Sequence, residues 1–277
     1  MSGGARDPAG APTAERRLLA RVDEALDGRR GGWRVARTTV GERLVAVELE
    51  GDGASAMGVA HCPAGGLGTP APDRADELSA WASRPPDDDP VAAALGIAAL
   101  NARSAGAVDW RPGDPMAALD PDVDVVATVG YFGAAFRRFH DVEVRVIERE
   151  PVGELSPPAG VSVSVHGPEE APAALRNVDV LFVTGSSLLY GGTLAYLDAA
   201  AAVPTVVLIG ATASFVPGPA FAAGVDVLAG VRVTEPEGVH QAVAADACGT
   251  DLHGAGLEKV HVAAEDVPAG LSFDAGP

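Results

Sequence analysis

Small hydroxyl residues and glycines follow an apolar run in the segment 183–197, VTGSSLLYGGTLAYL. The run is typical of a buried strand, and it ends in Thr184, Gly185 and Ser186. Hydroxyls and amides at such a strand end can hold a phosphate, a carboxylate or the oxygen of a metal chelate. The same side chains can instead cap the helix that follows. The sequence supports both interpretations, and one residue can do both.

Two further glycine turns follow predicted strands. Gly130 and Gly133 lie in TVGYFGAAF, a weaker signal than GxGxxG, which either cradles an anion or lets a strand and a helix approach closely. Glu148 ends the next strand, 18 residues after Gly130, where nucleotide-binding folds place an acidic residue on a ribose hydroxyl. Arg149 follows it and can pair with Glu148 or with a ligand. Gly210 and Thr212 follow a later strand, in LIGATAS.

Candidate metal ligands are few. His61 and Cys62 are the one adjacent pair of soft ligands, although such a pair is more often a packed strand end. No HExxH, P-loop, GxSxG or Ser-His-Asp order is present. Oxygen donors offer another route, through Glu148, Thr184, Ser186 and Asn101. Asn101 lies in a small, apolar helix, where its amide either bonds a neighbouring loop or meets a ligand.

The second half of the chain predicts a Rossmann-like domain. Continuous Val, Ile and Leu runs separated by helical segments indicate parallel strands buried on both faces. The expected strands are 123–130, 143–148, 161–165, 178–185, 204–210, 225–230 and 259–264. With the strand order 3-2-1-4-5, ligands bind outside the carboxyl ends at the point where the order reverses.

The first part predicts a smaller α+β domain. A one-sided apolar helix over 14–27 precedes three antiparallel strands at 33–41, 43–51 and 55–62, and helices are expected at 74–83 and 90–104. We expect a disordered tail at 1–12, an N-terminal α+β domain at 13–108, a linker at 109–122 and the Rossmann-like domain at 123–277.

Composition limits the function classes. The net charge is −18, and Lys259 is the only lysine among 20 basic residues. An acidic, lysine-poor surface is typical of halophilic proteins adapted to molar salt, and we favour this interpretation. The alternative is an ordinary acidic protein from a GC-rich genome. A basic footprint for nucleic acid is missing, and anionic membranes would repel such a surface. Without a signal peptide or a long apolar run, we expect a cytoplasmic protein.

The segments 183–197, 208–217 (LIGATASFVP) and 224–239 (GVDVLAGVRVTEPEGV) resemble the heavy-metal-chelation domain family. VGYFGAAF, VIEREP and ALNA (99–102) extend the resemblance over most of the chain. It implies an enolase-N-terminal-like meander with helices, joined to a Rossmann-like domain. Two departures concern ligand geometry: Tyr190 and Gly191 stand where the family has Asn, and Ala211 stands where Pro is common.

The leading hypothesis is a protein that binds a small ligand, or a heavy metal or its chelate, between the two domains. The expected ligand-binding residues are Asn101, Gly130, Gly133, Glu148, Thr184, Gly185, Ser186, Gly210 and Thr212, with His61 and Cys62 as weaker metal candidates. A divalent or heavy metal ion is the candidate cofactor. The alternatives are an enzyme with a nucleotide-like cofactor and a structural protein without a ligand. The sequence is also compatible with a homo-oligomer.

Overall fold

The N-terminal part is a three-stranded meander covered by helices. The computed structural model describes residues 13–29, 32–51, 53–84, 89–247, 250–264 and 268–273. Strands β1 (Arg34–Val40), β2 (Leu44–Gly51) and β3 (Ala54–His61) pair antiparallel in sequence order. Its helices are α1 (Ala14–Ala25), η1 (Asp27–Arg29), α2 (Ala75–Ser79), η2 (Ala80–Ser83) and α3 (Pro90–Ser104). The predicted meander with helices is confirmed.

Helix α3 is the centre of this part, and its composition explains its place. Nearly every residue of the helix is buried, because small Ala side chains let β2, β3, α2 and η2 approach it closely. Asp89 caps its first turn by accepting the Ala92 N–H, and Pro90 follows at the first helical position.

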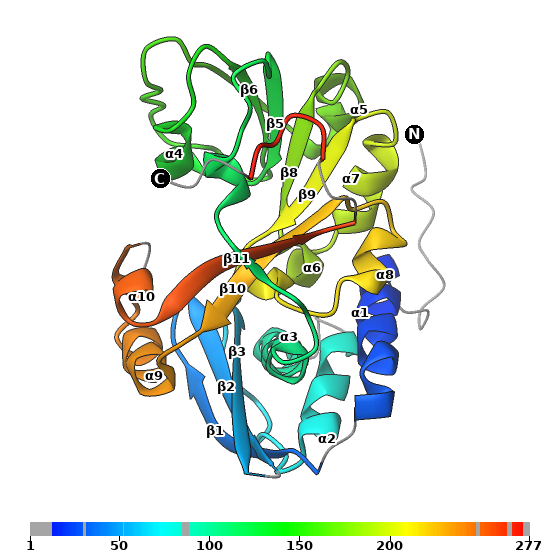
Figure 1. Ribbon diagram of the computed structural model, residues 1–277, viewed down its shortest axis with the longest axis vertical. Helices are drawn as coiled ribbons and strands as arrows, with labels where there is room; N and C mark the ends of the chain where they lie inside the picture. Colours follow the sequence, from blue (N-terminus) through cyan, green and yellow to red (C-terminus); the bar gives the residue numbers. More distant parts are fainter. Residues whose placement is uncertain are drawn as a thin grey trace, which may run out of the picture.

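The second sheet has eight strands in the order β4-β11-β10-β9-β8-β5-β6-β7 (Figure 1). The six strands from β10 to β7 are parallel, and β11 and β4 are added antiparallel at one edge. Their bounds are β4 Arg111–Pro112, β5 Val125–Val129, β6 Glu143–Ile147, β7 Ser162–His166, β8 Val180–Thr184, β9 Thr205–Ile209, β10 Val227–Val233 and β11 Leu257–Ala263. The chain order reverses between β5 and β8, as the sequence predicts for a doubly wound sheet.

Short helices connect these strands. They are η3 (Pro115–Ala117), α4 (Gly133–Phe136), η4 (Pro168–Glu170), α5 (Ala171–Ala174), α6 (Ser187–Tyr190), α7 (Thr193–Ala199), η5 (Ala211–Ala213), α8 (Gly218–Phe221), α9 (Pro236–Ala244) and α10 (Thr250–Gly254). The segment 109–122, expected as a linker, contributes β4 to the sheet edge. The division into domains at 108 and 123 stays a prediction.

Successive side chains of the buried strands point to opposite faces of the large sheet and pack into two different cores. On β8, Val180 and Phe182 pack with Phe136 and Phe139 on one face of the large sheet. Leu181 and Val183 face the other side and join one continuous core with α1 and α3 of the N-terminal part. The two parts therefore share a core instead of meeting at a thin interface.

Helix α9 packs on the other side of the meander (Figure 1). Val239 and Val243 of α9 meet Ala46 and Met57 of the small sheet. The meander thus lies between α3 and α9, one helix from each half of the chain.

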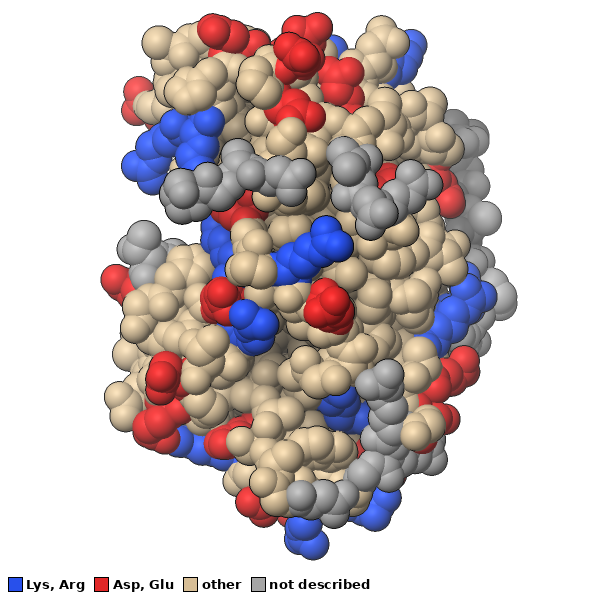
Figure 2. Space-filling model, viewed as in Figure 1, with Lys and Arg blue, Asp and Glu red and all other residues tan. Residues whose placement is uncertain are grey.

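The surface drawn in Figure 2 carries basic side chains in separate groups among acidic ones. In the part of the chain that the structure describes, no helix combines the length and the apolar character needed to span a membrane.

Candidate functional site

The carboxyl ends of β5 and β8 meet at Gly130 and Thr184. Gly130 has φ +96°, and a Cβ atom there would lie 3.1 Å from Thr184 Cγ2. Its N–H donates to the Ile147 carbonyl of β6, at 3.0 Å. The glycine therefore lets three strand ends converge with a partly exposed backbone between them.

Glu148 ties the end of β6 to the turn after β5. Its Oε2 accepts the Tyr131 N–H at 3.2 Å, and its Oε1 accepts the Arg149 N–H at 2.8 Å. The carboxylate is half-buried, and each oxygen keeps further acceptor capacity for a hydroxyl or a metal.

The hydroxyls of Thr184 and Ser186 bond each other and do not cap a helix. Their oxygens lie 3.0 Å apart, and both residues are partly exposed. Ser186 is the N-cap residue of α6, yet its side chain makes no cap hydrogen bond. Ser187 instead bonds the Thr184 carbonyl and the Thr193 hydroxyl, so it holds the turn. The capping interpretation therefore gains no support from this geometry.

Tyr190 connects the two halves of the chain. Its hydroxyl lies 2.9 Å from His61 Nε2, at the end of β3. The Arg149 guanidinium donates to the Tyr190 carbonyl at 3.0 Å and lies 5.5 Å from the ring centroid. Burial lowers the pKa of His61 and raises the pKa of Tyr190, so both groups are neutral near pH 7.

Thr212 and Gly185 place the η5 loop against this edge. The Thr212 hydroxyl accepts the His61 N–H at 3.0 Å. A Cβ atom on Gly185 would lie 3.3 Å from Thr212 Cβ, and Gly210, with φ +128°, begins the loop. Thr212 and Gly185 are buried, whereas Gly210 stays partly exposed.

Asn101 holds the η5 loop from the side of α3. Its Nδ2 donates to the carbonyls of Val59 at 2.8 Å and Ala211 at 3.1 Å, with Thr212 at 3.4 Å. Its Oδ1 is buried with no hydrogen-bond partner. Asn101 thus positions the loop that carries Thr212, and one acceptor stays unpaired.

Gly133 lies apart from the strand ends, at the start of α4. A Cβ atom there would lie 2.5 Å from the Tyr131 hydroxyl oxygen, so the missing side chain leaves room for the Tyr131 ring. We call the partly exposed residues Gly130, Glu148, Arg149, Thr184, Ser186, Tyr190, Gly210 and His61 the strand-end cluster.

The metal candidates at the end of β3 differ in accessibility. Cys62 is buried, its Sγ contacts the Pro63 carbonyl at 3.5 Å, and burial raises its pKa. Because the thiolate is the metal-binding form, a buried protonated thiol is a poor ligand. Across the described ranges, no three His, Cys, Asp or Glu side chains gather closely enough to hold a metal ion. These residues therefore do not fit a resident ion bound by protein ligands alone.

Sequence reasoning missed the role of Glu15. This buried residue of α1 accepts the N–H groups of Gly192 and Leu194, at 3.1 and 3.4 Å, where α7 begins. An acidic residue in the first turn of an amphipathic helix looks like ordinary surface, so no local signal identifies the contact. The contact between Tyr190 and His61 could have been suspected from the sequence, because Tyr190 stands at a position where the chain departs from the family pattern.

These features define a two-part α/β protein whose parts share one core. Its larger part is a doubly wound sheet, and the strand-end cluster gathers at the reversal of strand order. Residues 117–262 match the model of the DUF364 family, described as "Putative heavy-metal chelation". Residues 22–104 match the DUF4213 model, which carries the same description. Because the first match covers more than half of the chain, the protein belongs to the DUF364 family.

Solved structures of DUF364 family proteins have a fold similar to that of this chain. A DUF364 family protein of unknown function from Pyrococcus horikoshii has a TM-score of 0.74 and 20% identity, covering 89% of this chain and 99% of that one. A second DUF364 family protein of unknown function, from Desulfitobacterium hafniense, has a TM-score of 0.67 and 16% identity, covering 90% and 99%. No curated protein matches the sequence. The family matches confirm the predicted family, and the solved structures confirm the predicted fold.

Proposed function

We propose that the protein binds a small anionic ligand, or a heavy metal carried as a chelate by such a ligand, at the strand-end cluster. The observation that carries the proposal is the Thr184–Ser186 hydroxyl pair. It lies at the reversal of strand order, partly exposed, and neither hydroxyl caps α6. Hydroxyls in that position can donate to the oxygens of a ligand.

The donor set favours a chelate over a bare ion. Glu148 offers one carboxylate, His61 a neutral imidazole and Tyr190 a neutral phenol, and these differ from the three or four close ligands of a protein-bound metal site. A metal that arrives with its own ligands needs only one or two contacts from the protein. The metal is then cargo, which agrees with the family description.

Arg149 supplies the positive charge. Its guanidinium lies over Tyr190 and is exposed, on a protein whose net charge is −18. A carboxylate-rich chelator would pair with this guanidinium while its free oxygens meet the Thr184 and Ser186 hydroxyls.

Calorimetric titration with three probes tests the proposal: nickel ion alone, citrate alone and the nickel–citrate complex, each in about 2 M KCl. The complex should bind more tightly than either component. Ser186→Ala and Glu148→Gln should weaken it about tenfold or more while the melting temperature stays near that of wild type. Ser162→Ala and Glu154→Gln, exposed residues outside the cluster, are the matched controls.

Equal affinities in the Ser186 and Glu148 variants and in wild type would contradict the proposal. The strand ends would then serve packing alone. Absence of binding by all three probes would instead favour a structural protein without a ligand.

A second candidate rests on the position of Glu148 at the end of β6, next to the first parallel strand. An acidic residue there suits a ribose hydroxyl, which favours an enzyme with a nucleotide-like cofactor. That candidate predicts saturable binding of ATP or NAD that Glu148→Gln abolishes. A thermal shift with those nucleotides, and none with the chelate, would select it.

A further inference from the structure

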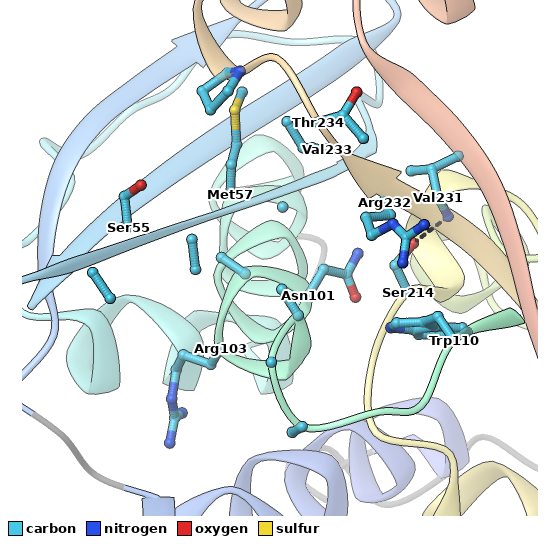
Figure 3. A pocket seen from close by; sticks show the side chains of 18 of the residues that line it. Ser55, Met57, Asn101, Arg103, Trp110, Ser214, Val231, Arg232, Val233 and Thr234 are labelled. Atoms are coloured by element: carbon cyan, nitrogen blue, oxygen red, sulfur yellow. Dashed lines mark hydrogen bonds between the residues drawn. The ribbon is translucent and has the colours of Figure 1, made fainter. Parts of the chain in front are cut away.

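A cavity of about 700 Å³ lies between the two halves of the chain, apart from the strand-end cluster. Its walls come from β3, β10, and the last turn of α3 with the loop after it (Figure 3). Ser214, which follows η5, also belongs to the lining. Its volume falls within the range of about 300–1,000 Å³ that small-molecule sites occupy.

One wall carries the unpaired acceptor of Asn101. The side chain extends from α3 toward Ser214, and Asn101 lines the cavity (Figure 3). All three bonds of its Nδ2 go to backbone carbonyls, so the contacts fix which end of the amide is oxygen. Oδ1 has no partner and is buried from water. Buried acceptors are normally paired, so this one points to a missing donor.

Ser214, in contrast, needs nothing from a ligand. Its hydroxyl donates to the Ala211 carbonyl at 3.0 Å and accepts the Val231 N–H at 2.9 Å. The ligand donor therefore goes to Asn101, and the wall must open slightly there when a ligand binds.

The charge of the cavity differs from that of the protein. Asp and Glu supply 38 of the 277 residues, yet none of those in the described part of the chain lines the cavity, whereas Arg103 and Arg232 both do. Arg103 is held inside the fold by Asp23 and Ser79. Arg232 donates to Glu258 through Nε and Nη2, and its side chain stays 43% exposed. An anion at the mouth would therefore meet its remaining Nη1 or compete with Glu258 for the guanidinium.

Two of the three tryptophans complete the walls. Trp110 is buried and faces the cavity close to Ser214 (Figure 3), and Trp33 is half-buried. Met57 and Val231 add apolar surface. Indole and thioether walls suit a flat aromatic molecule.

We propose that this cavity is a second binding site, for an aromatic anion that carries an N–H donor. The aromatic part packs against Trp110, the anion pairs with Arg232 and the N–H donates to Asn101 Oδ1. The cavity lining has no residue in common with the strand-end cluster, so either proposal can fail without the other.

Fluorescence titration of the full chain with three related probes tests the site. Anilinonaphthalene sulfonate has the aromatic body, the anion and the N–H. Its ether analogue replaces the N–H by oxygen, and N-phenylnaphthylamine lacks the sulfonate. Anilinonaphthalene sulfonate should bind tightest, with each analogue about tenfold weaker. In Arg232→Gln, anilinonaphthalene sulfonate should bind no more tightly than N-phenylnaphthylamine. It should still bind more tightly than the ether analogue.

Filling the cavity supplies the decisive variant. Ala56→Phe places a ring in the wall and should abolish saturable probe binding, whereas Ala173→Phe, at an exposed position of α5, should not. If Ala56→Phe does not fold, Ala105→Phe at the end of α3 fills the same space. Ser186→Ala should leave probe binding unchanged. Equal binding of all three probes, or full binding by a folded filled variant, would overturn the proposal.

Discussion

His61 Nε2 and the Tyr190 hydroxyl lie 2.9 Å apart and join the end of the meander to α6, the helix after β8. The two rings meet edge to face, with centroids 5.6 Å apart. The contact spans 129 residues of sequence. Tyr190 ends α6, the helix whose N-cap residue is Ser186, so Tyr190 belongs both to the junction and to the strand-end cluster.

Removing the hydroxyl should cost little stability. We expect Tyr190→Phe to lower the free energy of unfolding by about 0.5–1.5 kcal/mol, because one partly exposed hydrogen bond is lost while the ring contacts with His61 and Arg149 remain. Urea unfolding measures the change. Tyr131→Phe is the matched control, since the described residues offer its exposed hydroxyl no hydrogen bond. A loss above about 3 kcal/mol would show that the phenol does more than bridge.

The fold follows from local patterns to a large extent. The continuous apolar runs ending at Val129, Ile147 and Thr184 predict parallel strands, and the structure has them in the expected order. These patterns work because burial on both faces of a strand leaves a signal in the strand itself.

Contacts between distant segments left no such signal. Strand β4 is two residues long and lies in a stretch rich in Pro and Asp, so it looks like a linker although Arg111 pairs with His261. Helix α9 gives no sign of lying on the meander, because His240 and Thr39 are 201 residues apart. For the candidate site, the strand ends were predictable, but the direction of the Asn101 amide depends on carbonyls of two other segments.

Acid should destabilise the protein through His240. This histidine is fully buried, with Nδ1 2.8 Å from Thr39 Oγ1 and Nε2 3.3 Å from Glu48 Oε2. Burial lowers its pKa below the ordinary 6.5, and the Arg37 charge lowers it further, although Glu48 and Glu237 oppose the shift. The unfolded chain therefore takes up a proton first as the pH falls.

The sign of the pH effect follows. Stability is complete above about pH 6.5 and falls as the pH drops toward the lower pKa of the folded state, by at most about 1.4 kcal/mol per pH unit for one proton. Burial lowers the pKa values of His61 and His261 too, so both add to the slope. Urea unfolding at pH 7.5 and 5.5 should show a smaller difference in His240→Gln than in wild type. His140→Gln, at an exposed position, should keep the full difference, and equal slopes in the two variants would exclude His240 as a source.

Salt should stabilise the fold. With a net charge of −18, self-repulsion opposes the compact state, and about 1 M salt shortens the Debye length to roughly 3 Å. We expect the melting temperature to rise between low salt and about 2 M KCl. Sodium sulfate at equal ionic strength separates screening from general salting-out, because sulfate also strengthens apolar burial. A flat or falling melting temperature in KCl would leave the GC-rich genome as the explanation of the composition.

Gly58 should tolerate no side chain. It lies in β3 where the strand crosses α3, and a Cβ atom would lie 2.2 Å from the Ala98 carbonyl oxygen and 2.4 Å from the Ala102 nitrogen. Both neighbours are helix backbone, which no rotamer change can move.

Gly58→Ala therefore forces the sheet away from α3 and from the shared core. We expect a loss of about 3 kcal/mol or more in the free energy of unfolding, or failure to fold. Gly218→Ala is the matched control, because a Cβ atom there meets nothing within 4 Å and its φ is not in the left-handed region. If Gly58→Ala melts like the Gly218 control, β3 does not pack on α3 as closely as the structure shows, and the cavity beside Asn101 would then have a different shape.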